Sequence, residues 1–187
     1  MKLLLHICCA PCSSGVIEDI KKEFDVTVYF YNPNIDTAEE YEKRAEEVRK
    51  FMNIMDVKYV IEPHDSTSFY NAVKGLEQER EGGARCVECF RLRLNKTFQY
   101  AKLHGFDCVT TTLSVSPYKS ISQLNMVGTE MSQKYGIPYL TRDFKKNNGY
   151  LKSIQNSKKY NLYRQNYCGC VFSKRRDYVF GKKNAKD

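Results

Sequence analysis

The sequence predicts an α/β fold with a parallel, Rossmann-like sheet. Short apolar runs rich in β-branched and aromatic residues alternate with segments whose apolar residues recur at helical spacing, and this alternation continues for most of the 187 residues. A chain of this length is long enough to bury a sizeable core as one domain. From about residue 145 the alternation gives way to a basic, tyrosine-rich stretch. We expect one α/β domain over residues 1–187, with residues 145–187 packed on it as a basic C-terminal segment.

The first elements follow from local patterns. Residues 2–8 are an apolar run that we predict as the first strand, and residues 13–24 are predicted as a helix with a serine N-cap. Residues 26–33 form a β-branched and aromatic strand that ends in Asn-Pro. Residues 37–55 carry apolar positions at helical spacing after a threonine cap, which predicts a long helix.

The rest of the alternation supplies three more strands and three more helices. The strands are predicted over residues 57–63, 107–117 and 137–144, and the helices over residues 66–80, 86–105 and 120–136. Parallel sheets bind ligands beyond the carboxyl ends of their strands. The cysteines after the first strand and the hydroxyl-rich end of strand 107–117 therefore belong to one edge of the sheet.

Eight cysteines are the strongest chemical signal. Seven of them fall into three short groups: Cys8, Cys9 and Cys12; Cys86 and Cys89; Cys168 and Cys170. The eighth, Cys108, lies in a strand and is predicted to be a buried apolar residue. No run of about 18 apolar residues exists, and the apolar start is too short for a signal peptide, so we interpret the chain as cytoplasmic with no membrane span. In that reducing compartment, grouped cysteines indicate metal or redox chemistry.

The first two groups suit either an iron–sulfur cluster or zinc. Four thiolates hold a [4Fe–4S] cluster or a tetrahedral zinc ion, and the spacing of Cys86 and Cys89 serves both. The adjacent pair Cys8 and Cys9 is less typical of zinc, and with Cys12 five thiols converge, more than a structural zinc site uses. We therefore favour the cluster and keep structural zinc as the alternative.

The third group, Cys168-Gly169-Cys170, suits a reversible disulfide. Such a short ring is strained and easily reduced, which favours an electron relay over a structural bridge. The basic neighbours that would favour a thiolate are Arg164, Lys174, Arg175 and Arg176. The alternative is that both thiols are further metal ligands.

Positive charge is concentrated near the C-terminus. The net charge is +8, and residues 142–187 hold 13 Lys or Arg against 3 Asp or Glu. The aromatic residues among these cations are Tyr150, Tyr160, Tyr163, Tyr167, Phe172, Tyr178 and Phe180. Aromatic rings that stack on unpaired bases and cations that neutralise phosphates predict an RNA partner. The alternative is a tail whose aromatic residues pack on the sheet.

Four motifs together resemble the epoxyqueuosine reductase QueH family over essentially the whole chain. They are CCAPC at 8–12, RCVECF at 85–90, TTTLSVSPYKS at 110–120 and YCGC at 167–170. The resemblance implies a fold similar to the adenine nucleotide α-hydrolase (HUP) group. It also implies reduction of the epoxide of epoxyqueuosine to the alkene of queuosine, in the wobble position of tRNA with a GUN anticodon. No cobalamin is implied, and a separate electron donor is required. CCAPCSSG replaces the phosphate-binding loop of related ATP pyrophosphatases, which argues against ATP use.

The resemblance also implies roles for individual residues. Cys8, Cys9, Cys86 and Cys89 correspond to the ligands of a [4Fe–4S] cluster, and Cys168 and Cys170 to the redox-active pair. Cys12 corresponds to a ligand of an additional iron ion or to a nearby thiol. Which acid protonates the leaving oxygen is not implied; Tyr118, Lys119 and Lys145 are candidates by their proximity to the motifs. The competing function is a redox-sensing RNA-binding module, with zinc or an iron–sulfur cluster, that has no turnover. A thiol-disulfide oxidoreductase fits less well, because the first five thiols would have no role.

Overall fold

A computed structural model of the chain describes residues 1–174. The strands in this range are β1 (Lys2–His6), β2 (Asp25–Phe30), β3 (Lys58–Ile61) and β4 (Cys108–Thr111). The α-helices in this range are α1 (Ala10–Ser14), α2 (Ile17–Ile20), α3 (Ala38–Met55), α4 (Ser66–Ala72), α5 (Ala84–Leu103), α6 (Ile121–Tyr135) and α7 (Gly149–Lys159). The predicted alternation of strands and helices is therefore present.

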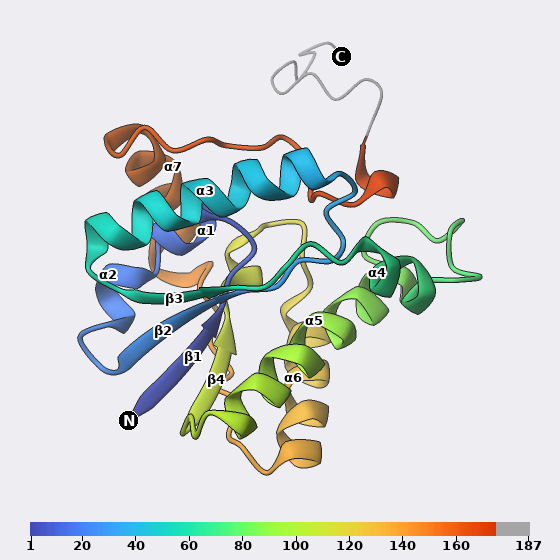
Figure 1. The fold of residues 1–187 in the computed structure, drawn as a ribbon, viewed down its shortest axis with the longest axis horizontal. Coiled ribbons are helices and arrows are strands. Elements are labelled where there is room, and N and C mark those ends of the chain that lie inside the picture. Colours follow the sequence, from blue (N-terminus) through green and yellow to red (C-terminus); the bar gives the residue numbers. More distant parts are fainter. Residues whose placement is uncertain (175–187) are drawn as a thin grey trace, which may run out of the picture.

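The four strands form one parallel sheet in the order β3-β2-β1-β4 (Figure 1). The chain runs outward from β1 to β2 and β3, then returns through α4 and α5 and places β4 on the other side of β1. The strand order thus reverses at β1. In open parallel sheets, the crevice beyond the carboxyl ends of the strands at such a reversal is the usual ligand site.

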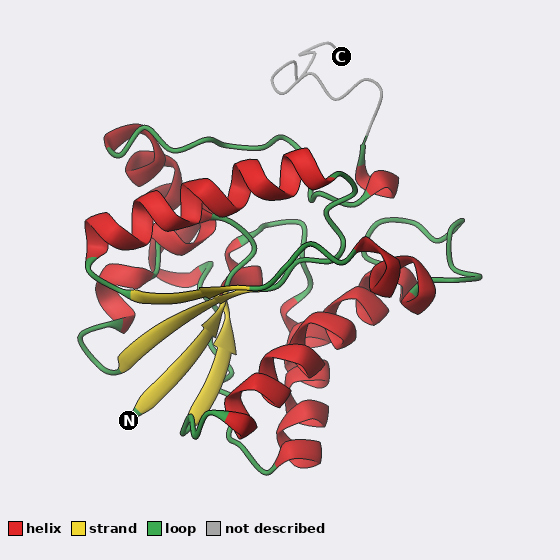
Figure 2. Ribbon diagram, viewed as in Figure 1, coloured by secondary structure: helices red, strands yellow, loops and turns green. Residues whose placement is uncertain are grey.

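Helices cover both faces of the sheet. Figure 2 shows α1, α2, α3 and α7 on one side of the strands and α5 and α6 on the other. Because side chains alternate along a strand, Leu3 and Leu5 of β1 enter the core beneath α1 to α3, whereas Leu4 enters the core beneath α5 and α6. Cys108 is fully buried in the core that contains Leu3 and Leu5, which confirms its prediction as a buried apolar residue.

One predicted helix and one predicted strand end well before the predicted residue. The helix predicted over 66–80 ends at Ala72, and Gly75 follows with a φ of +83°, which an α-helix does not contain. The strand predicted over 107–117 ends at Thr111. The Thr111 hydroxyl accepts a hydrogen bond from the backbone N–H of Leu113 and so begins a 3₁₀ turn, Thr112–Val115.

The strand predicted over 137–144 is wrong. A single parallel bridge between Val109 and Tyr139 is all that forms there. The Leu140 N–H donates to the carbonyl of Val109 at 2.9 Å, but the Arg142 N–H then donates back to the carbonyl of Leu140 at 2.9 Å. This tight turn ends the pairing after one bridge.

The basic segment begins with α7, which packs on α1. The side-chain amide of Asn156 donates to the carbonyl of Ser14 at 2.6 Å. A Cβ at Gly15 would lie 2.5 Å from the carbonyl oxygen of Gly149, so this close approach requires glycine. None of the helices within residues 1–174 combines the length and the apolar composition needed to cross a bilayer.

Candidate metal and redox centre

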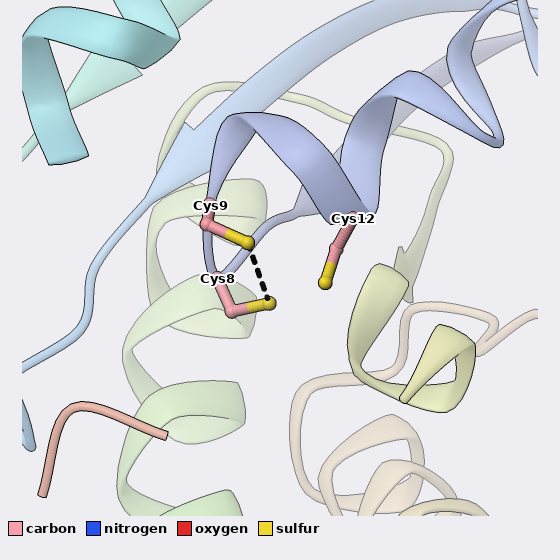
Figure 3. Close-up of side chains that lie close together, drawn as sticks. All are labelled: Cys8, Cys9 and Cys12. Atoms are coloured by element: carbon pink, nitrogen blue, oxygen red, sulfur yellow. Dashed lines mark hydrogen bonds between the residues drawn. The ribbon is translucent and has the colours of Figure 1, made fainter. Parts of the chain in front are cut away.

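The first cysteine group lies where β1 ends and α1 begins (Figure 3). Cys9, in extended backbone, is the N-cap residue of α1, and Cys12 lies in the first turn after Pro11. The sulfur atoms of Cys8, Cys9 and Cys12 all lie within 4.8 Å of one another, and those of Cys8 and Cys9 are 3.7 Å apart. The predicted serine N-cap is wrong, because both serines lie inside α1 and donate to its own carbonyls.

These three thiols share their protons. Hydrogen bonds from the thiols of Cys12 and Cys8 hold the pKa of Cys9 well below its usual range. Contact with Cys8 and Cys9 raises the pKa of Cys12 well above its usual range. Of the three thiols, Cys9 is therefore the one that ionises most readily. Thiolate sulfur is the donor that soft metals and iron–sulfur clusters select, so this set of residues fits such a centre.

The second group, Cys86 and Cys89, lies in the first two turns of α5. Neither residue belongs to the group within 4.8 Å. Both instead line a small cavity of about 30 Å³. Burial raises the pKa of Cys89 to about 12 and also raises the pKa of Cys86. Both thiols are protonated at neutral pH, so a metal that binds them must displace their protons.

The third group connects the other two. Cys168 lines the small cavity and also a larger cavity of about 680 Å³, which Cys8 and Cys12 line as well. Cys170 lines the small cavity and packs in one apolar cluster with Cys89. All eight cysteines of the chain are free thiols in this structure. Members of all three cysteine groups therefore line the two cavities, and Cys168 lines both of them.

Residues of α3 and of the segment after β2 hold the loop Cys168-Gly169-Cys170, here called the C-G-C loop. The guanidinium of Arg44, on α3, and the side-chain amide of Asn34 both donate to the carbonyl oxygen of Cys168, at 3.2 and 3.4 Å. The Asp36 N–H donates to the carbonyl of Gly169 at 3.0 Å. Gly169 has a φ of +110°, and a Cβ there would lie 3.0 Å from a guanidinium nitrogen of Arg44. The loop therefore requires glycine at this position.

The larger cavity lies at the reversal of the strand order, between the segments that follow β1 and β4. Tyr118 and Lys119 line both cavities. Burial alone would lower the pKa of Lys119, but the neighbouring thiols of Cys168 and Cys8 act in the opposite direction and raise it overall, so its ammonium group stays protonated. Lys145 lines neither cavity and instead donates to the carbonyl of Lys119 at 2.6 Å.

The described part of the basic segment divides between the cavity wall and the core. Tyr150, Tyr167, Arg164 and Lys174 line the larger cavity. The other aromatic residues contact protein groups: Tyr160 packs against Phe51, the hydroxyl of Tyr163 donates to Glu40, and Phe172 lies against the guanidinium of Arg85. Arg175, Arg176, Tyr178 and Phe180 lie outside the described residues. The packing alternative therefore holds for Tyr160, Tyr163 and Phe172, whereas the stacking of Tyr150 and Tyr167 on RNA stays a prediction.

Two residues that hold the C-G-C loop, Asn34 and Arg44, were not predicted from the sequence. A partial signal exists for Asn34, because Asn32-Pro33-Asn34 directly follows β2 at the edge of the sheet where ligands bind. Arg44 carries no such signal. Arg44 is one of several charged residues of α3, and such residues are expected on the solvent-exposed side of a helix. Its side chain is nevertheless only 2% exposed.

Comparisons with known proteins identify the family. Residues 3–176 match the model of the family described as epoxyqueuosine reductase QueH. An epoxyqueuosine reductase QueH of Streptococcus pyogenes serotype M1 is 40% identical over 193 residues, covering 98% of this chain and 76% of that protein. The epoxyqueuosine reductase QueH of Dehalococcoides mccartyi is 34% identical over 188 residues, covering 98% of this chain and 97% of that protein.

A solved structure supports the fold. The U34-tRNA thiolase NcsA of Methanococcus maripaludis, a structure with its [4Fe–4S] cluster, has a TM-score of 0.57 and 11% sequence identity, covering 92% of this chain and 61% of that chain. At this identity the likeness concerns the fold, and it confirms the predicted α/β, HUP-like architecture. The family model and the sequence relatives show that the chain belongs to the epoxyqueuosine reductase QueH family of oxidoreductases.

Proposed function

We propose that this protein reduces the epoxide of epoxyqueuosine, in the wobble position of tRNA with a GUN anticodon, to the alkene of queuosine. One observation carries the proposal beyond family membership. Cys168 lies on the wall between a cavity lined by Cys8 and Cys12 and a cavity lined by Cys86, Cys89 and Cys170. A redox-active thiol between two sets of metal-ligand thiols is an arrangement for moving electrons.

The ligands follow from the three cysteine groups. Cys8, Cys9, Cys86 and Cys89 would hold a [4Fe–4S] cluster, and Cys12 would hold an additional iron ion. When bound, these centres supply single electrons and a Lewis acid for the epoxide oxygen. Because the pKa values of Cys86 and Cys89 are raised, binding of the cluster releases protons from these two thiols.

The thiols of Cys168 and Cys170 balance the reaction. Both C–O bonds of the epoxide break, a C=C bond forms and the oxygen leaves as water, which consumes two electrons and two protons. Oxidation of two thiols to one disulfide supplies two electrons and two protons. The electron donor must then reduce that disulfide before the next turnover. The protonated Nζ of Lys119 faces the same space and stabilises negative charge on the departing oxygen.

The wall of the larger cavity suits a nucleotide of tRNA. The aromatic rings of Tyr118, Tyr150 and Tyr167 offer surfaces on which an unpaired base stacks. The cations of Lys119 and Arg164 lie on the same wall and favour a ligand with phosphates. A cavity of about 680 Å³ is large enough for one extruded nucleotide.

The test begins with protein purified without oxygen. Iron and acid-labile sulfide should each be about four per chain, with extra iron for the additional site. The protein is then incubated with reductant and tRNA that carries epoxyqueuosine, and the nucleosides are quantified by mass spectrometry. Conversion to queuosine is expected. Zinc without sulfide after attempted reconstitution, together with RNA binding but no conversion, would overturn the proposal in favour of an RNA-binding module.

Variants separate the roles of the cysteines. Cys168→Ser and Cys170→Ser should lose at least about 100-fold in turnover while they keep iron and sulfide at the wild-type level. Cys108→Ser is the matched control, because Cys108 is a free thiol in the core and away from both cavities. Loss of iron in Cys168→Ser would show that this thiol is a ligand and would remove the dithiol step from the mechanism.

A further inference from the structure

Arg93 is a buried cation with no carboxylate partner among residues 1–174. Its side chain, on α5, is 1% exposed. One guanidinium nitrogen donates to the side-chain oxygen of Asn32, and Nε has no hydrogen-bond partner in the described part of the chain. No carboxylate oxygen of the described residues lies within 4.0 Å of this guanidinium. Two other arginines are buried, and both differ: Nε of Arg44 pairs with Glu40 at 2.7 Å, and the guanidinium of Arg85 donates to three backbone carbonyls of residues 76–79.

An unpaired buried guanidinium requires a nearby negative charge. Arginine stays protonated in proteins, and a charge that is removed from water without a counter-ion strongly destabilises the folded state. The thiols of Cys86 and Cys89 lie on the same helix as Arg93, and the charge of Arg93 acts on the pKa of Cys89. Those thiols become negative charges when they bind a metal.

The position of Arg93 places it behind both sets of cluster ligands. Arg93 follows Cys89 by four residues and Cys86 by seven, so all three lie on one face of α5. On its other side, the side-chain amide of Asn32 donates to the carbonyl of Ile7 at 3.0 Å, and Ile7 directly precedes Cys8. Asn32 thus fixes the guanidinium between α5 and the end of β1. Burial raises the pKa of Cys89, and the charge of Arg93 acts in the opposite direction.

We propose that Arg93 is the fixed counter-charge of the iron–sulfur cluster and raises its reduction potential. This inference rests on the proposed cluster. A cluster held by four thiolates carries net negative charge, and reduction adds one more. A buried positive charge at fixed distance stabilises the reduced form more than the oxidised form, because the local dielectric constant is low.

The test is a reductive titration of the reconstituted wild-type protein and its variants, followed by electron paramagnetic resonance. Arg93→Met and Arg93→Gln remove the charge, and the glutamine variant keeps a hydrogen-bond donor for Asn32. Both should shift the midpoint potential to a more negative value. Arg93→Lys should stay close to wild type, because it keeps the charge.

Arg91→Met is the matched control. It removes one positive charge from the same helix, but Arg91 is partly exposed and already pairs with Glu88 and Glu130. Its midpoint potential should equal that of wild type. Circular dichroism and the iron and sulfide content of each variant accompany the titration.

The outcomes are distinguishable. Neutral variants that hold a cluster at the wild-type potential overturn the role of Arg93, while the proposed function stands. Neutral variants that fold but lose the cluster, beside an Arg93→Lys protein that keeps it, support a counter-charge. Loss of the cluster in all three variants, Arg93→Lys included, means that the guanidinium shape and not its charge is needed, which overturns the inference. A wild-type protein that never acquires a cluster overturns the proposed function as well.

Discussion

The guanidinium of Arg44 donates a hydrogen bond of 3.2 Å to the carbonyl oxygen of Cys168, although 124 residues separate them. A second guanidinium nitrogen donates to the carbonyl of Tyr167 at 3.5 Å, and Nε pairs with Glu40 at 2.7 Å. The side chain is nearly inaccessible to solvent. One buried arginine therefore fixes the position of the thiol that faces both cavities.

We expect Arg44→Met to lower turnover at least about tenfold, because the C-G-C loop loses its anchor. The variant leaves Glu40 and two loop carbonyls without their partner, which should lower the free energy of unfolding by about 3 kcal/mol. Iron and sulfide content should stay at the wild-type level. Turnover is measured by nucleoside analysis and stability by urea denaturation.

Arg44→Lys supplies the control for charge. Lysine pairs with Glu40 but lacks the forked donors that reach Tyr167 and Cys168 together, so its turnover should lie between those of wild type and Arg44→Met. Turnover equal to wild type in Arg44→Met, measured on folded and iron-loaded protein, would contradict the anchoring role.

Gly169→Ala should disable the same loop from the other side. A Cβ there would lie 2.9 Å from Ile35 and 3.0 Å from Arg44, and the φ of +110° disfavours any side chain. Gly105→Ala is the matched control, because Gly105 also has a positive φ, +66°, but nothing lies within 4 Å of its Cβ position.

Both glycine variants should lose about 1 kcal/mol or more in the free energy of unfolding, since both impose a positive φ on alanine. Only Gly169→Ala should also lose turnover. The idea fails if urea denaturation shows equal stability loss for the two variants and the tRNA assay shows equal, undiminished turnover.

Local pattern was enough to predict most of the scaffold. The helix predicted over 37–55 is observed as α3, with the hydroxyl of Thr37 accepting a hydrogen bond from the Glu40 N–H at 3.1 Å. Such features depend on residues within one or two turns, so the sequence shows them directly. The strand predicted over 137–144 fails because its pairing ends at a turn near Arg142, and nothing in its composition shows this.

The sequence predicts only in part which segments meet at the candidate site. The cysteines after β1 and the segment after β4 meet because parallel strands end at one edge, a rule that topology supplies. The arrival of Cys168 at that edge depends on buried contacts from Arg44 and Asn34. These contacts cross long stretches of sequence, and no periodicity or motif records them.

The stability of the fold should depend on pH through His6. This residue is fully buried on β1, where Nδ1 lies 2.8 Å from the hydroxyl of Thr111. Burial lowers the pKa of His6 to about 3. The folded protein therefore keeps a neutral imidazole while the unfolded chain takes up a proton near pH 6.5. The stability that His6 contributes is complete above this pH and falls as the pH decreases toward 3.

Urea denaturation of the reduced, metal-free protein at pH 7 and pH 5 tests this dependence against His6→Gln. The variant lacks the titrating group, so its disadvantage relative to wild type should shrink by about 2 kcal/mol from pH 7 to pH 5. A difference between the two proteins that is the same at both pH values would mean that His6 does not titrate as described.

Under the proposed ligand assignment, Cys12 is the residue that distinguishes the additional iron site from the cluster. Its sulfur lies within 4.8 Å of those of Cys8 and Cys9, yet Cys12 lines the larger cavity, whereas Cys86 and Cys89 line the smaller one. We expect Cys12→Ser to lose the additional iron and turnover while it keeps the four-iron cluster with its visible absorption. Cys89→Ser should lose the cluster, and Cys108→Ser should lose neither. Iron, sulfide and the visible spectrum are measured on all three. A Cys12→Ser protein that loses cluster iron and sulfide together would show that Cys12 is a cluster ligand. In that case either Cys86 or Cys89 would not be a ligand of the cluster.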